Sequence, residues 1–227
     1  MPVTETTATP DGAEFTPAPE RVISDVETLK ALSDPVRLKI LETMIQAADE
    51  DWTVKRIATA LGVGPTKLYH HMAILEEREL IRVAGTRVVS GIIETRYRIA
   101  QLSVRLDRAL LSADTPTDEA TEAVDAMLRT VFDAARDDVG RALRTGAIAT
   151  AAGAEPTPGI LRQDLNRMSP ARAAEFRDRL TALLDEFDLG KHDDPDGVPF
   201  GLLIALYPVP DSRLAPSADP SQEPTDD

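Results

Sequence analysis

Apolar residues recur three and four positions apart early in the chain, which predicts two consecutive helices. Ser24 has capping-box spacing to Glu27, so a short first helix is expected to begin there. Asp34-Pro35 supplies an N-cap residue and a proline for the first helical position, and the apolar pattern predicts a second helix to about Ala47. The apolar positions of the first helix are Val26, Leu29 and Leu32.

Two more short helices flank a tight turn. Trp52 and Thr53 open the third predicted helix, and Gly62 ends it, because glycine commonly follows a helix C-terminus. The fourth predicted helix covers residues 65–79. Its inward positions are Leu68, Met72, Leu75 and His71. The sequence therefore predicts a helix, a short turn and a second helix.

The spacing then changes. Residues 81–90 and 92–100 are rich in β-branched side chains and are separated by the turn dipeptide Ser90-Gly91, which predicts a β-hairpin. A further helix is predicted from a four-residue repeat of leucines at Leu102, Leu106 and Leu110. Residues 24–112 thus predict the order α-α-α-turn-α-β-β-α.

The rest of the chain predicts a small α/β region over residues 113–210. A long amphipathic helix is expected from about Thr115 to Arg144, and a second follows Ser169-Pro170. Two short apolar runs, residues 159–161 and 199–207, are interpreted as strands able to pair. The inward positions of the long helix are Val124, Met127, Leu128, Val131, Ala135 and Val139.

Composition limits the chemistry available. The chain has 227 residues, 42% of them hydrophobic, which suffices for one large domain or two small ones. It has no cysteine, so thiolate metal sites and cysteine nucleophiles are excluded. The sequence also shows no phosphate-binding loop and no hydrolase motif, so we expect no catalytic residues, cofactor or metal. Residues 192–197 lack the spacing of a calcium loop and are interpreted as a turn.

The two ends of the chain contain few large apolar side chains. Residues 1–20 and 211–227 are therefore predicted to be disordered tails. No apolar run approaches the ~20 residues of a membrane span, and the N-terminus lacks a signal-peptide profile. We expect a soluble, cytoplasmic protein with no membrane partner.

The formal net charge of −14 is distributed unevenly. Residues 1–20 carry a net charge of −4, residues 21–100 a net charge of +1, and residues 101–227 a net charge of −11. Within the middle segment, residues 55–98 contain eight basic and four acidic side chains. A basic stretch inside an acidic chain is consistent with a surface that binds nucleic acid.

A helix, a turn and a second helix, followed at once by a basic hairpin, have the order of a winged helix-turn-helix domain. A helix about 10–12 Å across fits the major groove of B-DNA, and the hairpin reaches the neighbouring backbone or minor groove. The predicted fold class is therefore mainly α with small β. It comprises an N-terminal winged helix-turn-helix domain over residues 21–112 and a helical α/β C-terminal region.

The sequence resembles the ArsR-like bacterial winged-helix regulators. The resemblance is carried by LKALSDPVRLKILETM (29–44), TVKRIATALGVGPTKLYHHMAILEERELI (53–81) and SGIIETRYRIA (90–100). It implies a DNA-binding transcriptional regulator, more often a repressor than an activator, of a cysteine-free subgroup with an extra C-terminal region. The thiolate metal sites of founding members have no counterpart here, because the chain lacks cysteine.

The resemblance also implies where the partners bind. Double-stranded DNA would contact the recognition helix, residues 65–79, and the wing, residues 81–99, at Thr66, Lys67, Tyr69, His70, Arg87 and Arg96. A homodimer on an inverted-repeat operator would pair through the first helix and the segment after the wing. That interface maps onto Val26, Leu29, Leu32, Leu102, Leu106 and Leu110; the alternative is that these residues only complete the domain core.

Two rival functions stay open. The acidic C-terminal region could make the winged helix a protein-interaction module, which would lack salt-dependent DNA affinity. Alternatively, the chain could be a ligand-binding protein without specific DNA binding, stabilised by a small-molecule effector of unknown identity between the C-terminal helices.

Overall fold

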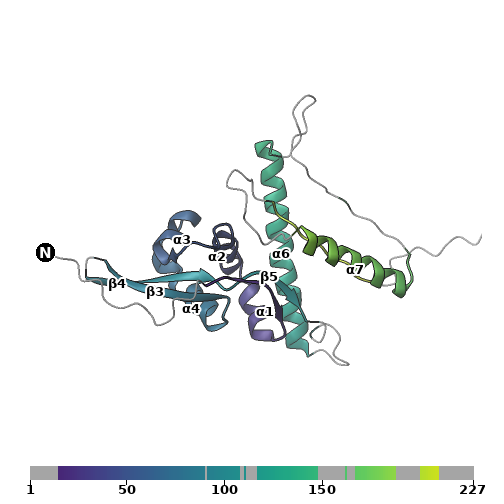
Figure 1. Ribbon diagram of the computed structural model, residues 1–227, viewed down its shortest axis with the longest axis horizontal. Helices are drawn as coiled ribbons and strands as arrows, with labels where there is room; N and C mark the ends of the chain where they lie inside the picture. Colours follow the sequence, from purple (N-terminus) through teal and green to yellow (C-terminus); the bar gives the residue numbers. More distant parts are fainter. Residues whose placement is uncertain are drawn as a thin grey trace, which may run out of the picture.

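The computed structural model describes residues 15–89, 91–107, 110, 117–147, 162, 167–187 and 200–209. The hairpin of β3 and β4 extends to one side of a group of short helices, and the long helix α6 stands on the other side (Figure 1). In chain order the elements are β1 (Ala18–Ile23), α1 (Val26–Leu32), α2 (Pro35–Ile45), β2 (Trp52–Thr53), α3 (Val54–Leu61), the 3-10 helix η1 (Pro65–Lys67), α4 (Tyr69–Glu77), β3 (Ile81–Val89), β4 (Ile92–Ile99), β5 (Gln101–Leu106), α6 (Asp118–Thr145) and α7 (Pro170–Glu186).

Carboxylate caps begin the first two helices. Asp34 caps α2 as predicted, because its side chain accepts two backbone N–H hydrogen bonds at 2.9 and 3.0 Å. For α1 the prediction was wrong by one residue: Asp25, not Ser24, accepts a hydrogen bond from the backbone N–H of Thr28 at 2.7 Å. A carboxylate also interacts favourably with the positive end of the helix dipole, which a neutral hydroxyl cannot do to the same extent.

Residues 52–53 form a strand, whereas the sequence pattern predicted the opening of a helix. Trp52 pairs with Tyr97 and Thr53 pairs with Arg96 in an antiparallel ladder between β2 and β4. The hydroxyl of Thr53 also accepts a hydrogen bond from the backbone N–H of Arg56 at 3.2 Å, so the last residue of the strand is the N-cap of α3.

The predicted recognition helix, residues 65–79, is divided in two. The N–H of Leu68 donates to the carbonyl of Pro65 at 2.9 Å, which closes the tighter turn of a 3-10 helix before α4 begins. The helix ends at Glu77, and Glu79 adopts a positive φ of 53°. The recognition helix is therefore shorter at both ends than its apolar pattern indicates.

The predicted hairpin is confirmed. β3 and β4 pair antiparallel, with Val89 opposite Ile92 beside the turn, and Gly91 has a positive φ of 81°. Ser90, the other predicted turn residue, lies outside the described residues. A register shift occurs at Gly85, where an added Cβ would come within 2.9 Å of the Arg96 guanidinium. The three-stranded sheet has the order β2-β4-β3.

A parallel pair of strands corrects two predictions. β1 pairs with β5, with Ile23 opposite Leu106. Residues 18–20 therefore lie in a strand rather than in the predicted disordered tail, while residues 1–14 lie outside the described part. The helix predicted from Leu102 onward is likewise a strand up to Leu106. The leucine spacing suits a helix, and it gives no sign that β1, which is distant in the sequence, pairs with this segment.

One apolar core holds the short helices, the base of the wing and the first half of α6. Its fully buried side chains are Ile23, Leu29, Ile40, Met44, Ile57, Leu68, Met72, Leu75, Leu80, Ile81 and Ile99. α6 enters the core through Ala123 and Met127. Each such large apolar side chain contributes about 1.5–3 kcal/mol when fully buried.

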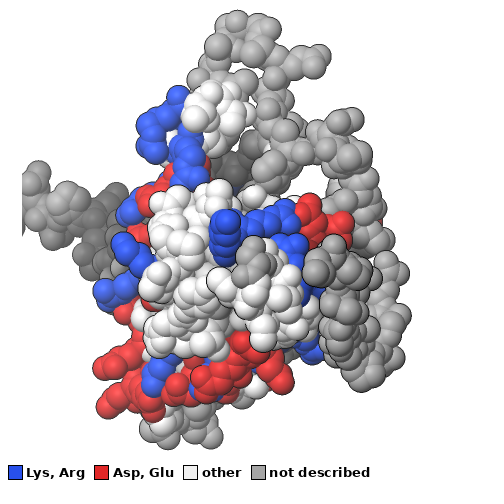
Figure 2. Space-filling view, turned by 90° about the vertical axis from the view of Figure 1, so that its left-hand side faces the viewer, with Lys and Arg blue, Asp and Glu red and all other residues white. Residues whose placement is uncertain are grey.

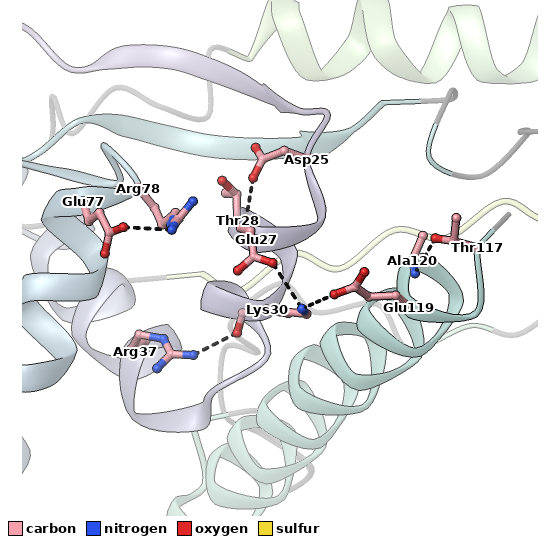
Figure 3. Close-up of polar contacts among 10 residues, drawn as sticks. All are labelled: Asp25, Glu27, Thr28, Lys30, Arg37, Glu77, Arg78, Thr117, Glu119 and Ala120. Carbon is pink, nitrogen blue, oxygen red and sulfur yellow. Dashed lines mark hydrogen bonds and ion pairs between the residues drawn. The ribbon is translucent and has the colours of Figure 1, made fainter.

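Polar contacts add to the attachment of α6 to α1 (Figure 3). The Lys30 ammonium donates to the carboxylates of Glu119 at 2.6 Å and Glu27 at 3.1 Å. These hydrogen bonds raise the pKa of Lys30, and the bond from Lys30 lowers the pKa of Glu119. The hydroxyl of Thr130 donates to the backbone carbonyl of Ser33 at 2.7 Å. The contacts fix how α6 lies along the N-terminal domain.

The predicted C-terminal helices are present as α6 and α7, and Ser169 caps α7 as expected. The strand predicted over residues 199–207 is not: residues 200–207 are exposed and form no strand. A strand needs a hydrogen-bonded neighbour, and none of the described residues pairs with this segment. Residues 159–161 and the turn predicted at 192–197 lie outside the described part.

Within the described residues, no helix is both long enough and apolar enough to cross a bilayer. The longest helix, α6, carries charged side chains along its length.

Gly62 offers a direct test of the turn between α3 and α4. Its φ of 67° is a conformation that strains any residue with a Cβ, although there is open space around it. Gly62→Ala should lower the free energy of unfolding by about 1 kcal/mol, measured by urea denaturation. Gly64→Ala is the matched control, because Gly64 has a φ of −74° and equal space, and it should change stability by less than about 0.5 kcal/mol. Equal effects of the two substitutions would contradict this account.

Candidate nucleic-acid interface

The helix-turn-helix unit consists of α3, the turn at residues 62–64, η1 and α4. The left-handed conformation of Gly62 reverses the chain, and the N–H of Val63 donates to the carbonyl of Ala58 at 3.0 Å. The buried side chain of Leu68 then anchors the junction of η1 and α4 in the core. With this side chain directed inward, the residues around it face outward.

The start of the recognition helix presents polar side chains to solvent. All four residues predicted to contact DNA here are exposed: Thr66, Lys67, Tyr69 and His70. The phenol of Tyr69 can stack on a sugar or contact a thymine methyl group. Within the described part of the chain, the Lys67 ammonium has no ion-pair partner, so its charge is free to meet a phosphate.

His71 has a different position from His70. The imidazole of His71 is largely buried, and its Nδ1 lies 3.5 Å from the carboxylate of Asp34. The two histidine rings are tilted by 60° with their centroids 6.0 Å apart. His71 therefore packs against the start of α2, while His70 stays on the outer face.

Among the described residues, no cluster of three acidic or histidine side chains could hold a metal ion.

Arg87 lies on the exposed part of the wing. Its guanidinium donates to the carboxylate of Glu94 at 2.6 Å, directly across the two strands, while more than half of its side chain stays exposed. The pair contributes little to stability, because water screens the guanidinium of Arg87. Arg87 can therefore exchange Glu94 for a phosphate at small cost.

Arg96 is held at the base of the wing and is only partly exposed. Its guanidinium donates to one carboxylate oxygen of Asp51 at 2.7 Å, and Arg98 donates to the other oxygen, also at 2.7 Å. The guanidinium that was predicted to contact phosphate is thus paired with Asp51 in the single chain, with 37% of the Arg96 side chain exposed. Asp51 precedes β2 directly, so its carboxylate ties the wing to the strand that leads into α3. Sequence reasoning missed this role, because it depends on the register between β2 and β4.

A shallow groove of about 510 Å³ separates α3 from the outer part of the wing. Its cationic lining residues are Lys55, Arg56 and Arg87. Arg56 lies 4.0 Å over the Trp52 ring and pairs with Glu50, whereas Lys55 is exposed and makes no ion pair within the described residues. Among the described residues, Lys55 is therefore a second cation without an ion-pair partner, in addition to Lys67. The signal that could have identified it is its place in the first turn of α3, within the basic stretch.

Tyr97 lies in the middle strand of the sheet, opposite Trp52 on one side and Val83 on the other. Burial raises the pKa of its hydroxyl, and the nearby carboxylate of Glu76 acts in the same direction. Tyr97 therefore stays neutral near pH 7 and adds no negative charge beside the recognition helix.

Acidic and basic side chains are separated on the face towards which the wing projects. Figure 2 shows Lys and Arg mainly above and beside a broad uncharged surface and most Asp and Glu in the lower part of this face, with some acidic side chains next to the basic ones above. The net charge of −14 is thus not spread evenly over the molecule.

The residues predicted to form a dimer interface lie in or against the core of a single chain. Leu29 and Leu32 are buried, and the other four, Val26, Leu102, Leu106 and Leu110, are partly buried against the same core. One chain therefore already packs all six against its own core. The exposed apolar side chains of α6 lie further along, among them Leu128, Phe132, Val139 and Leu143.

Asp51→Asn tests the tie between the wing and β2. Removing the charge leaves two partly buried guanidinium groups without their anion, so the free energy of unfolding should fall by about 1–2 kcal/mol in urea denaturation. The matched control is Glu94→Gln, because Glu94 is as buried as Asp51 (24% and 25% exposed) but pairs with only one guanidinium, that of Arg87, which is 59% exposed; it should cost less than about 0.5 kcal/mol. An equal loss in both variants would show that Asp51 has no special structural role.

Comparison with known proteins adds one match. A family model described as a helix-turn-helix domain matches residues 32–84, a range that runs from the end of α1 into β3. No curated protein matches the chain. The matched range contains α3, the turn and α4, so sequence comparison and geometry identify the same unit. The chain thus contains a helix-turn-helix domain, which supports DNA binding and transcription regulation as its function.

Proposed function

We propose that the protein is an ArsR-like, sequence-specific transcriptional regulator that binds DNA as a homodimer and acts as a repressor. The observation that carries this proposal is the surface formed by η1, the start of α4 and the wing. There, exposed hydrogen-bonding and aromatic side chains lie around Lys67, and Lys55 of α3 lines the groove beside the wing; neither lysine has an ion-pair partner within the described residues. The helix-turn-helix match over the same residues supports the assignment to DNA.

In the proposed complex the N-terminal end of the recognition helix enters the major groove. Thr66, Tyr69 and His70 would face base edges, because side chains near the start of this helix are the ones that reach them in helix-turn-helix complexes. Lys67 and Lys55 would neutralise phosphates on either side of the groove. Arg87 would bind a phosphate after releasing Glu94, while Arg96 keeps the wing in place through Asp51.

The exposed stripe of α6 is the better candidate for the dimer interface. Leu128, Phe132, Ala135 and Val139 alternate four and three residues apart, the spacing of a two-helix seam. The charged side chains between residues 128 and 142 are three arginines and three aspartates, so this segment is neutral in a strongly acidic chain. Two copies could therefore pair along α6 without the repulsion that the rest of the C-terminal region would impose.

Repression would follow from occupation of the promoter. Two recognition helices related by a two-fold axis read half-sites about 34–36 Å apart, so the operator should be an inverted repeat. A regulator bound there excludes other proteins from the same DNA.

Binding to DNA from upstream of the coding sequence tests the proposal. Fluorescence anisotropy with this duplex and with a scrambled duplex, from about 50 to 200 mM salt, separates specific from non-specific association. We expect preference for the upstream duplex at the higher salt concentration. Absence of salt-dependent affinity for either duplex would instead favour a protein-interaction module.

Lys67→Ala should weaken DNA binding and lower the slope of log affinity against log salt by about one, because one phosphate contact is lost. The measurement is the same anisotropy titration. Lys39→Ala is the matched control, since Lys39 lies on α2 and already pairs with Glu42 at 3.1 Å. It should leave affinity and slope unchanged. A normal slope in the Lys67 variant would remove this residue from the interface.

Phe132→Gln should convert the proposed dimer to a monomer at micromolar concentration, measured by light scattering coupled to size-exclusion chromatography. Phe132 is 48% exposed in a single chain, and its burial against a second copy would be lost. Phe176→Gln is the matched control, because Phe176 of α7 is 52% exposed but lies off the seam. A dimer that survives in the first variant and dissociates in the second would place the interface on α7.

A further inference from the structure

The wing is long and its tip is apolar. β3 has nine residues and β4 has eight, so at about 3.4 Å per residue the hairpin extends roughly 25–30 Å from its base. Figure 1 shows it projecting past α3 and α4. At its outer end Val88 and Ile92 are each 71% exposed, Ile93 is 70% exposed and Val89 is 44% exposed.

The apolar residues of the tip cover both faces of the hairpin. Val88 lies directly opposite Ile93, and Val89 lies directly opposite Ile92. Because successive side chains of a strand point to opposite faces, one pair lies on each face. Natural hairpins usually place charged residues on such exposed strands. Two exposed aliphatic pairs at the tip therefore indicate a binding surface.

The charge of the wing indicates which partner the tip meets. Residues 81–99 contain four arginines and one glutamate, and the carboxylate of Asp51 offsets part of this excess at the base, so the wing keeps a net positive charge in a chain whose net charge is −14. Arg87 and Glu94 form the pair immediately behind Val88 and Ile93, so a cation stands beside the apolar end. A polyanion that also offers apolar surface fits this arrangement. The minor groove of DNA does so, because phosphates line its rims and deoxyribose carbons form both of its walls.

We propose that the wing tip is an aliphatic wedge, formed by Val88, Val89, Ile92 and Ile93, that inserts into the minor groove and bends the duplex. The inference rests on the proposed DNA-binding function and adds how the DNA is deformed. Two strands about 4.8 Å apart, with side chains on both faces, exceed the width of a minor groove of about 6 Å. The groove must therefore open, and apolar wedges that open it kink DNA by about 20–90°.

The wedge also gives the protein a way to read sequence without hydrogen bonds to bases. Pyrimidine–purine steps such as TA unstack easily, whereas A-tracts are stiff. Insertion should therefore favour a flexible step at the position of the tip, several-fold over a stiff one.

The experiment uses the full chain and the duplex that it binds best in the anisotropy titration, labelled at both ends for energy transfer. The variant Ile92→Thr/Ile93→Thr keeps β-branched side chains, so the hairpin remains favoured while its apolar surface is reduced. The matched control is Val22→Thr/Val104→Thr. These valines, 41% and 44% exposed, lie on the β1–β5 pair away from the tip.

We expect the unmodified protein to bend the duplex and the tip variant to bind it with a clearly smaller bend and roughly tenfold lower affinity. The control variant should bend it fully. A tip variant with the normal bend and affinity would overturn the wedge while leaving DNA binding intact. Loss of self-association with an unchanged bend would overturn it in favour of a protein partner. Failure of the unmodified protein to bind any duplex would overturn the proposed function itself.

Discussion

The pairing of the two-residue strand β2 with β4 determines how the DNA-facing elements are placed relative to one another. Trp52 and Thr53 pair with Tyr97 and Arg96, so the chain that enters α3 is fixed to the wing. Thr53 is at the same time the N-cap of α3. A strand this short has little stability of its own, and the ion pairs of Asp51 with the two wing arginines strengthen it where it begins. Helix and wing therefore move as one body.

The basic residues around this strand pair differ in whether internal contacts hold their charges. Arg96 and Arg98 satisfy Asp51, and Arg56 packs on Trp52, so their charges maintain the scaffold. Lys55 and Lys67 remain free on the outer face, as far as the described residues extend. The planar guanidinium suits bidentate and stacked contacts inside a protein, whereas a lysine ammonium is a mobile point charge. A count of basic side chains would assign phosphate binding mainly to arginines. In the proposed complex, lysines carry much of it instead.

Local signals in the sequence predicted local structure well. Asp34 and Gly62 identify a helix start and a helix end because a cap or a positive φ involves only the neighbouring residues. The parallel pair of β1 and β5 escaped prediction because its strands are far apart in the sequence, and the leucine spacing of β5 also suits a helix. The burial of Leu68, Met72 and Leu75 followed from helical periodicity. The internal role of Arg96 did not, since it requires the register between two strands.

The attachment of α6 connects the proposed dimer to the proposed DNA contacts. α6 packs on α1 through apolar side chains and is positioned by the bonds from Lys30 to Glu119 and from Thr130 to Ser33. α1 belongs to the core that also holds the recognition helix. A two-fold axis along the exposed half of α6 would therefore set the separation of the two recognition helices through these contacts within each chain. Half-site spacing is then a property of how α6 lies on α1, and an effector that shifts α6 by a few ångströms would change operator affinity without touching the DNA-binding residues.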